Sequence, residues 1–415
     1  MARVGAESRR QVAEGQHPRP QVTREARGCS PRRIYISTTS INHNTTTFQM
    51  TQIPPLNIAQ SSQSVNVHVI DTTVKIDGPT DFFLKPRVGN MDRLVANAFT
   101  FLIEHPTTKQ KVVFDLGVRK DANELSSPFW KGFRVNFVID VEKDVADILQ
   151  DNNIDLTSID AIIWSHRHAD HTGDPSTFPP CVDLIFGPGA PAARLPGYPT
   201  NQKSSLFEAD YQGRKLVEIT QDKFDLQIGE FRAFDYFGDG SFYLLDVPGH
   251  DIGHVCGLAR TTANGTQTSE DDSFVLMGAD TCHHAGQLRP SEFQPLPSEI
   301  HPHPKDSEAM PAPFASTCLQ KIHPKGQLYH SCPFYEVGVL ENGFSMSESP
   351  EVTAQSIEKM LPFDAAPNVL LILAHDVTLQ DTVNLFPAMV NGWEDTALKD
   401  ETRWRFLRDW STAFE

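Results

Sequence analysis

The chain has 415 residues with 36 Lys and Arg against 53 Asp and Glu, which gives a net charge of −17. This acidity argues against nucleic acid as a substrate, so a small-molecule substrate is expected. Its six cysteines are scattered without Cys-x-x-Cys spacing, and no stretch is apolar enough to span a membrane. We therefore expect reduced thiols, a cytoplasmic location and no membrane partner, while the oligomeric state stays open.

The first 49 residues differ in composition from the rest of the chain. They are polar, carry eight Arg and three Glu, and are short of apolar side chains, which is the composition of disorder. We predict a disordered N-terminal extension over residues 1–49. A single catalytic domain is then expected over residues 50–415.

Two stretches near the start of this predicted domain alternate in the manner of β-strands. Residues 65–75 and 98–117 show the period of two, with a turn at 105–108 inside the second stretch. Residues 141–149 place apolar side chains at helical spacing, which predicts a helix.

The most informative segment is a histidine-rich stretch that follows an apolar run. Residues 159–164 predict a short buried strand, and the loop leaving it carries His166, His168, Asp170 and His171. Three imidazoles and a carboxylate within six positions indicate a metal site, although a chance cluster of surface histidines is the alternative. These four residues cannot complete the shells by themselves, so further ligands are expected downstream.

The region after the ligand loop contains a Pro/Gly-rich segment and a predicted hairpin. Residues 188–199 are expected to be irregular because of their Pro and Gly content. Residues 231–237 and 241–247 are expected to pair around Gly238-Asp239-Gly240. Five aromatic residues of this hairpin are expected to supply apolar surface around the substrate, some of them as core: Phe234, Tyr236, Phe237, Phe242 and Tyr243.

Three further apolar strands each end in a candidate ligand. Residues 244–247 lead through Pro-Gly to His250, residues 274–279 lead to Asp280, and residues 368–374 lead to His375. Each pattern alone is commonplace. Together with the histidine-rich loop, they supply seven ligands, which is enough for two metal ions that share one carboxylate.

Two C-terminal regions complete the expected organisation. Residues 285–335 contain nine Pro and four His, and predict an irregular insertion. We interpret it as a wall or lid over the metal pair, with a surface excursion as the alternative, and assign none of its histidines as ligands. Residues 393–414 are expected to form two short amphipathic helices that cover a sheet.

The order of the motifs His-x-His-x-Asp-His, Pro-Gly-His, Gly-Ala-Asp and Ala-His-Asp resembles the metallo-β-lactamase superfamily. Within it, the chain is most similar to dinuclear lactonase-like hydrolases and their fungal relatives. The resemblance implies an α/β (α+β) fold, the four-layer αβ/βα sandwich, which agrees with strands and helices alternating in two halves. It also implies the metal ligands: His166, His168 and His250 for one ion, Asp170, His171 and His375 for the other, and Asp280 as the bridge.

The resemblance also implies roles for residues beside the ligands. Asp115 matches the family's early Asp-x-Gly and is expected to orient the ligand loop. Where similar lactonases carry a Tyr three residues after the bridging Asp, this chain has His283. An imidazole can donate a proton or hydrogen bond from that place, so His283 is predicted to be catalytic, with a structural or solvent-facing histidine as the alternative. Acyl-homoserine-lactone specificity is put in doubt. His254 is interpreted as a partner of the ligands, and Cys282 as an apolar filler.

The ligand types decide the expected chemistry. Imidazole and carboxylate suit Zn²⁺, so two Zn²⁺ ions per chain are expected, with Mn²⁺ and Fe²⁺ as alternatives. Two ions about 3.5–4 Å apart lower the pKa of a shared water, giving a hydroxide whose proton Asp170 is placed to accept. We predict a hydrolase that opens a lactone, lactam or cyclic carbamate. A thioesterase of acyl-carrier or glutathione thioesters, a mononuclear-iron sulfur dioxygenase and a binding protein are the alternatives.

Overall fold

The computed structural model describes residues 51–265, 269–301 and 314–414. The predicted extension over residues 1–49 lies outside these described ranges. Within them, no helix has the length and apolar character needed to cross a membrane.

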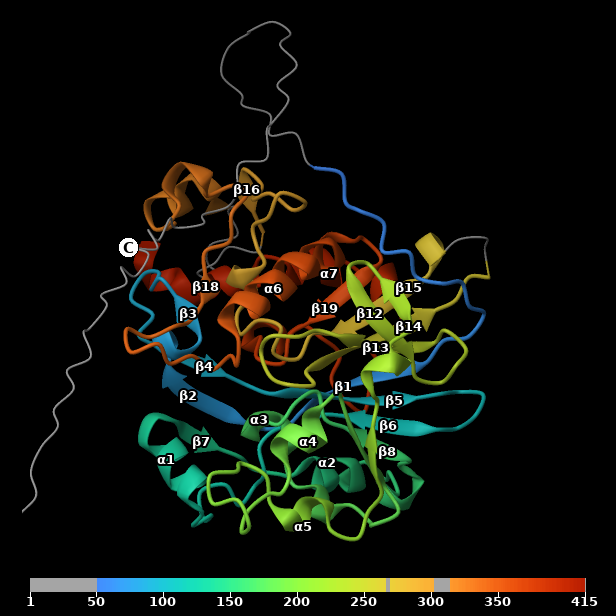
Figure 1. Cartoon of the computed structure of the whole chain (residues 1–415). Coiled ribbons are helices and arrows are strands. Elements are labelled where there is room, and N and C mark those ends of the chain that lie inside the picture. Colours follow the sequence, from blue (N-terminus) through green and yellow to red (C-terminus); the bar gives the residue numbers. More distant parts are fainter. Residues whose placement is uncertain (1–50, 266–268, 302–313, 415) are drawn as a thin grey trace, which may run out of the picture. The chain divides into compact units, whose positions relative to one another are not determined.

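Two six-stranded sheets form the centre of the fold (Figure 1). The first has the order β1-β5-β6-β8-β9-β10, with β1 (Asn66–Asp71), β5 (Phe99–Glu104), β6 (Lys111–Phe114), β8 (Ala161–Ile163), β9 (Asp183–Phe186) and β10 (Leu216–Glu218). The second has the order β11-β12-β13-β14-β15-β19, with β11 (Leu226–Ile228), β12 (Phe231–Asp235), β13 (Phe242–Asp246), β14 (Val255–Thr262), β15 (Ser273–Met277) and β19 (Val369–Ile372).

Helices cover the outer face of each sheet, while the inner faces share one buried core. Phe101 of the first sheet and Val275 of the second belong to this shared core. On the outer side of the first sheet, α2 (Val145–Asp151) packs in a cluster with strands β5, β6 and β8. On the outer side of the second, α6 (Pro350–Ala365) packs in a cluster with β13, β14 and β15. The predicted αβ/βα sandwich of four layers is confirmed.

A small sheet with its own apolar cluster adjoins the sandwich. Its order is β4-β2-β7, with β2 (Lys75–Pro79), β4 (Arg93–Ala96) and β7 (Val138–Asp140). The helix α1 (Pro128–Asn136) packs against it. This helix begins after Ser127, whose Oγ accepts a hydrogen bond from the backbone N of Trp130 at 3.4 Å, and Pro128 occupies its first position.

The remaining elements are short. Two pairs of two-residue strands are β3 (Leu84–Lys85) with β18 (Glu336–Val337), and β16 (Glu299–Ile300) with β17 (Phe314–Ala315). The other α-helices are α3 (Ala169–Thr172), α4 (Ala190–Arg194), α5 (Glu208–Tyr211) and α7 (Leu398–Thr402). The described 3₁₀ helices are Thr80–Phe82, Leu156–Ser158, Pro175–Thr177, Gln221–Lys223, Ser269–Asp271, Ala285–Gln287, Ser316–Lys321, Gly326–Leu328, Val377–Leu379, Trp393–Asp395 and Arg405–Phe414.

Most predicted elements are confirmed, and two predictions are wrong. The hairpin over residues 231–247 forms, because β12 and β13 pair antiparallel. Residues 188–199 are not wholly irregular, because α4 tolerates Pro191 in its first turn, where no intrahelical N–H bond is lost. The C-terminal region holds α7 between two 3₁₀ helices in place of two amphipathic α-helices.

The direction of the strands explains why the ligands meet. In the second sheet β13 runs antiparallel to β14, β14 runs antiparallel to β15, and β15 runs parallel to β19. The strands β13, β15 and β19 therefore point the same way, and their carboxyl ends lie at one edge. In the first sheet, β8 runs parallel to β6 and carries the histidine-rich loop at its own carboxyl end.

Candidate metal centre

Four loops at the ends of these strands bring the seven predicted ligands together. Residues 166–171 follow β8 and lead into α3, while His250, Asp280 and His375 follow β13, β15 and β19. The ligand atoms fall into two groups, each with all its atoms within 4.8 Å of one another: His166, His168, His250 and Asp280 in the first, and Asp170, His171 and His375 in the second.

Three imidazoles converge in the first group. Nε2 of His166 lies 3.1 Å from Nε2 of His250, and Nδ1 of His168 lies 2.9 Å from the same atom. Oδ2 of Asp280 lies 3.2 Å from Nε2 of His250 and 3.6 Å from Nε2 of His166. Three ring nitrogens and one carboxylate oxygen therefore face a common point.

The other oxygen of the same carboxylate faces the second group. Oδ1 of Asp280 lies 3.0 Å from Nε2 of His171 and 2.9 Å from Nε2 of His375. Nε2 of His375 also lies 3.5 Å from Oδ2 of Asp170. Asp280 thus stands between the two groups and presents one oxygen to each.

Hydrogen bonding in the protein does not account for all of these atoms. Nε2 of His171 and Oδ1 of Asp280 are buried and have no hydrogen-bond partner among the described residues, although they lie 3.0 Å apart. Ligands of a tetrahedral Zn²⁺ ion, with bonds of about 2.0 Å, lie about 3.3 Å apart. The facing atoms of the first group are 2.9 to 3.6 Å apart, so the side chains fit a metal ion.

The charge states also suit a metal. Burial lowers the pKa of His166 and of His168 well below the ordinary value, so both imidazoles stay neutral at pH 7. Burial opposes ionisation of Asp280, but the neighbouring His171 and His375 outweigh it and hold the pKa of that carboxyl well below its usual range. Although burial opposes it, the carboxylates of Asp280 and Asp115 raise the pKa of His171 well above the ordinary value, and Asp280 also raises the pKa of His375. A metal ion binds the neutral imidazole, so an ion at the second group would replace a proton on each of these rings.

Several ligands are oriented through their outer ring nitrogens. Nδ1 of His171 donates to Oδ2 of Asp115 at 2.8 Å, and Nδ1 of His375 donates to the backbone oxygen of Asn97 at 2.6 Å. Asp115 also accepts hydrogen bonds from N and Oγ of Ser165, at 2.7 Å each. Asp115 therefore contacts the ligand loop in the way its motif predicts. The sequence does not identify Asn97 or Ser165 as partners of the predicted ligands. Asn97 acts through its backbone oxygen, which does not depend on the residue type.

His254 contacts the backbone of Asp280. Its Nδ1 donates to the backbone oxygen of Val247 at 2.9 Å, and its Nε2 accepts the backbone N–H of Asp280 at 3.2 Å. This agrees with its interpretation as a partner of the ligands. Cys282 is buried in the core cluster of the second sheet, as expected for an apolar filler.

The residues just before two of the predicted ligands have unusual backbone conformations. Gly249, just before His250, has a φ of +121°, and an added Cβ would lie 2.3 Å from the backbone N of Thr353 in α6. Only glycine fits there. Ala279, just before Asp280, has a φ of +41°, a strained conformation for a non-glycine residue. Tight backbone geometry thus precedes both of these ligands.

His283 lies beside the carboxylate of Asp280. Its Nε2 is 3.2 Å from Oδ2 of Asp280, and its backbone N donates to Oε1 of Gln287 at 2.8 Å. The ring lies 4.9 Å from the ring of Phe83 and is nearly parallel to that of His375. Burial lowers the pKa of His283, so it is a neutral imidazole at pH 7.

The aromatic residues predicted to surround the substrate lie elsewhere. Phe242 and Tyr243 are fully buried in the two core clusters of the second sheet. Phe237 packs on His105 at the hairpin end of β13, whereas His250 follows the opposite end of that strand. The prediction is therefore wrong, because the hairpin points away from the ligands.

Half-buried aromatic side chains pack against the apolar cluster of the small sheet, and one of them, Phe83, contacts the centre. Ala169, between two ligands, belongs to the apolar cluster of this sheet, against which Phe82, Phe83 and Phe133 pack. Phe83 also contacts His283. Among the predicted ligands, only His168 and Asp170 are partly exposed, which places the open side of the centre next to Ala169.

The described parts of the insertion over residues 285–335 are mostly irregular, as predicted, and pack on the outer face of the second sheet. Leu288, Leu319 and Phe334 belong to the same cluster as α6. His323 is buried and its Nε2 donates to the backbone oxygen of Cys332 at 2.9 Å, so it is not a ligand. Residues 302–313 lie outside the described ranges, and a role as a wall over the metal pair stays a prediction.

The fold and the His/Asp site together define a metal-dependent hydrolase. The model of the metallo-beta-lactamase superfamily matches residues 94–260. The gamma-lactamase FDB1 of Fusarium pseudograminearum (strain CS3096) is 42% identical over 369 residues, which cover 87% of this chain and 86% of that protein. The metallo-hydrolase mfmC of Annulohypoxylon moriforme is 37% identical over 369 residues, which cover 87% of this chain and 91% of that protein. The chain belongs to the metallo-β-lactamase superfamily.

A solved structure supports the fold independently. An N-acyl homoserine lactone hydrolase, with the product N-hexanoyl-L-homoserine bound at its catalytic metal center, matches with a TM-score of 0.51. The match covers 79% of this chain and 99% of that one at 13% identity. At this identity the likeness shows the fold alone.

Proposed function

We propose that this hydrolase holds two Zn²⁺ ions and opens a cyclic ester or amide, namely a lactone, a lactam or a cyclic carbamate. The observation that carries the proposal is Asp280, whose Oδ2 faces the first group of ligands while its Oδ1 faces the second. One carboxylate with an oxygen for each group is the arrangement that two neighbouring ions require. The relatives are a gamma-lactamase and a metallo-hydrolase, which supports the same class of reaction.

Each ligand has a defined place in this proposal. His166, His168 and His250 would hold the first ion, Asp170, His171 and His375 would hold the second, and Asp280 would offer one carboxylate oxygen to each. When bound, two Zn²⁺ ions lower the pKa of water toward neutrality and polarise the substrate carbonyl. The nearby thiol of Cys282 is a poor nucleophile, since it is buried and burial raises its pKa well above the usual range.

Two side chains act on protons and hydrogen bonds. Asp170 is partly exposed, with 18% of its side-chain surface accessible, so it faces the open side and accepts the proton of the attacking water. His283 is neutral and close to Asp280, and donates a hydrogen bond to the substrate carbonyl or its departing atom. Because ring opening creates charge on these atoms, a donor that is already in place lowers the barrier.

Metal analysis and a substrate panel test the proposal. We expect two metal ions per purified chain, loss of turnover on chelation and its return with Zn²⁺. The panel contains a γ-lactam, a γ-lactone, a cyclic carbamate and an acyl-glutathione thioester, and we expect turnover of at least one cyclic compound. Asp280→Ala should lose both metal and turnover, while Asp183→Asn, at the start of β9 and paired with Lys215, should keep both. Turnover of the thioester alone, or one ion per chain with oxygen consumption, would contradict the proposal.

A further inference from the structure

A buried carboxylate lies directly after the ligand His250. The side chain of Asp251 is only 1% exposed and faces two arginines. Arg194 of α4 donates to its Oδ1 at 2.5 Å, and Nε of Arg167 lies 3.3 Å from the same oxygen. The backbone N of Arg167 donates to Oδ2 at 3.5 Å. A buried charge is costly unless it is paired, and Arg194 supplies the hydrogen-bonded partner, while the guanidinium of Arg167 adds an ion-pair contact without a hydrogen bond from its Nε.

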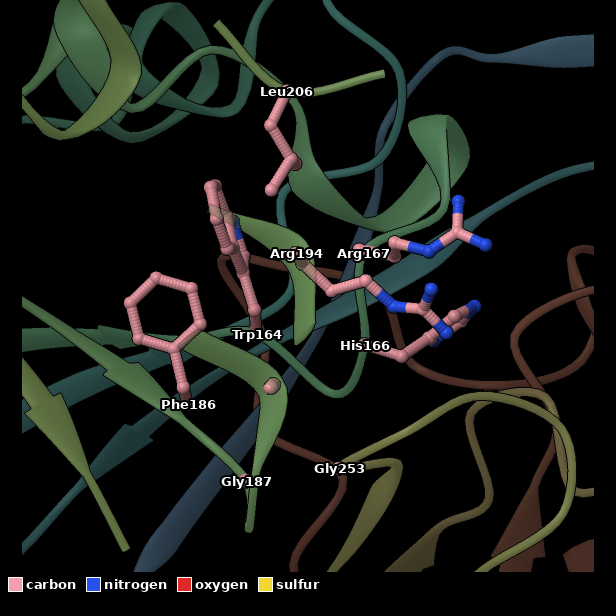
Figure 2. A pocket seen from close by; sticks show the side chains of 9 residues that line it. Trp164, His166, Arg167, Phe186, Gly187, Arg194, Leu206 and Gly253 are labelled. Carbon is pink, nitrogen blue, oxygen red and sulfur yellow. The ribbon is translucent and has the colours of Figure 1, made fainter. Parts of the chain in front are cut away.

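The contacts of Asp251 lead to all three histidines of the first group. Arg167 stands between His166 and His168 in the chain, so its link to Asp251 joins the histidine-rich loop to the loop that carries His250. Figure 2 shows that the side chains of Arg167 and Arg194 extend to the same side, away from Trp164. One carboxylate thus spans the two loops whose ring nitrogens must converge.

A second route closes the connection around His250. Arg194 also donates to Oε2 of Glu348 at 2.8 Å, and the backbone N of Glu348 donates to the backbone oxygen of His250 at 2.8 Å. His250 is thus connected to Arg194 twice, once through the neighbouring Asp251 and once through Glu348. These two connections hold the loop that carries His250 from two sides.

His168 depends on this support more than the other histidines. His171 and His375 have hydrogen-bond partners on their outer nitrogens, but no such partner for Nε2 of His168 is found among the described residues. Its position therefore follows from the backbone next to Arg167. Arg167 also places a positive charge near a site meant for a cation, and Asp251 neutralises that charge.

We infer that Asp251 is a positioning residue for the first metal ion: it sets the separation of the two ligand loops and cancels the charge of Arg167. This inference rests on the proposed two-metal centre. It predicts that loss of the carboxylate weakens the binding of one ion and spares the other. A general structural role would instead weaken both ions together.

Stepwise metal titration of the metal-free full chain tests this. The chain is titrated with Zn²⁺ against a chromophoric chelator, and with Co²⁺ followed by its visible absorption. We expect Asp251→Asn to weaken one binding step 10- to 100-fold and to leave the other within about threefold. The binding step that Asp251→Asn weakens should be the step that is missing in His250→Ala. The same step should still be present in His375→Ala. Asp246→Asn is the matched control, because Asp246 lies nearby and pairs with Gln221.

A second variant guards against loss of folding. Glu348→Gln changes a residue whose side chain is 47% exposed, so folding is retained, and it should weaken the same step about three- to tenfold. The inference would be overturned if Asp251→Asn and Glu348→Gln changed neither metal-binding step, or if they weakened both steps equally. The proposed function would stand in either case. A wild-type chain that binds fewer than two ions would overturn the proposed function and the inference with it.

Discussion

Oδ2 of Asp115 lies 2.8 Å from Nδ1 of His171, so a carboxylate on the loop after β6 orients a predicted ligand in α3, the short helix that follows β8. The same carboxylate accepts two hydrogen bonds from Ser165. Asp115 has a φ of +61°, a conformation that Asp adopts more readily than most residues. The side chain of Asp115 therefore makes three contacts with the segment that carries the predicted ligands.

Replacing Asp115 with Asn should impair this orientation. An amide is neutral and can present its NH₂ group to Nδ1, so His171 loses its charged acceptor. We expect metal affinity and kcat/KM to fall by about 10- to 100-fold. Inductively coupled plasma analysis and steady-state kinetics measure both. Asp160→Asn, which loses a carboxylate bonded to the backbone N of Lys111 on the neighbouring strand, should change neither.

The variants of His283 separate hydrogen bonding from metal binding. His283→Phe removes the donor, and we expect kcat to fall about 100-fold with two ions still bound. His283→Tyr retains a donor, so it should lose less. Equal kcat for His283→Phe and wild type would show that this imidazole does not touch the reacting atoms.

The convergence of the seven predicted ligands could be anticipated because each one follows an apolar strand in a local motif. His166, His250 and Asp280 are read from short segments, and strand direction then brings them together. Contacts across the chain carried no such signal. The backbone oxygen of Asn97 that orients His375 is 278 positions away, and the Arg194 that pairs with Asp251 is 57 positions away.

The aromatic surroundings were predicted wrongly for a related reason. The composition of the β12–β13 hairpin was read correctly, but its aromatic residues lie at the end of β13 that is far from His250. Phe83 takes their place only because the small sheet packs beside the ligand loop. Which segment packs beside a site depends on tertiary structure, which periodicity does not encode.

Substitution of Phe83 tests the new location of the aromatic surface. Phe83→Leu removes ring contact beside His283 and should raise KM about tenfold for substrates with an aryl or long acyl group, with kcat nearly unchanged. Compounds with a small ring alone should be affected little. Phe234→Leu, in the hairpin that the sequence favoured, should leave KM unchanged. If Phe234→Leu raised KM and Phe83→Leu did not, the aromatic surface that contacts the substrate would lie on the hairpin and not at Phe83.

Deletion of residues 1–49 tests the proposed domain organisation. We propose that residues 50–415 form the whole catalytic domain, since the ligands span 166 to 375. The shortened chain should keep its turnover, metal content and Tm. A Tm lower by several degrees would show that the extension contributes to folding.

Glu104, away from the candidate metal centre, forms contacts that bear on stability. Oε2 of Glu104 lies 3.2 Å from Nε2 of His68, and its Oε1 lies 3.0 Å from Nζ of Lys111. The hydrogen bond from His68, with a further contribution from Lys111, lowers the pKa of Glu104 to about 2 from an ordinary value of 4.5. Solvent screening reduces the energy of such a half-buried pair, so we assign it about 1 kcal/mol.

The sign of the pH dependence follows from this shift. A carboxyl group whose pKa is lower in the folded state stabilises that state above its unfolded value of 4.5, and the contribution fades as the pH falls toward 2. Glu104→Gln should therefore be about 1 kcal/mol less stable than wild type at pH 7 in urea unfolding. The difference should shrink below pH 4.5 and vanish as the pH falls toward 2. Glu358→Gln, an exposed change on α6, should match wild type throughout. A constant difference between pH 7 and pH 3 would mean that packing, and not the charge of Glu104, is responsible.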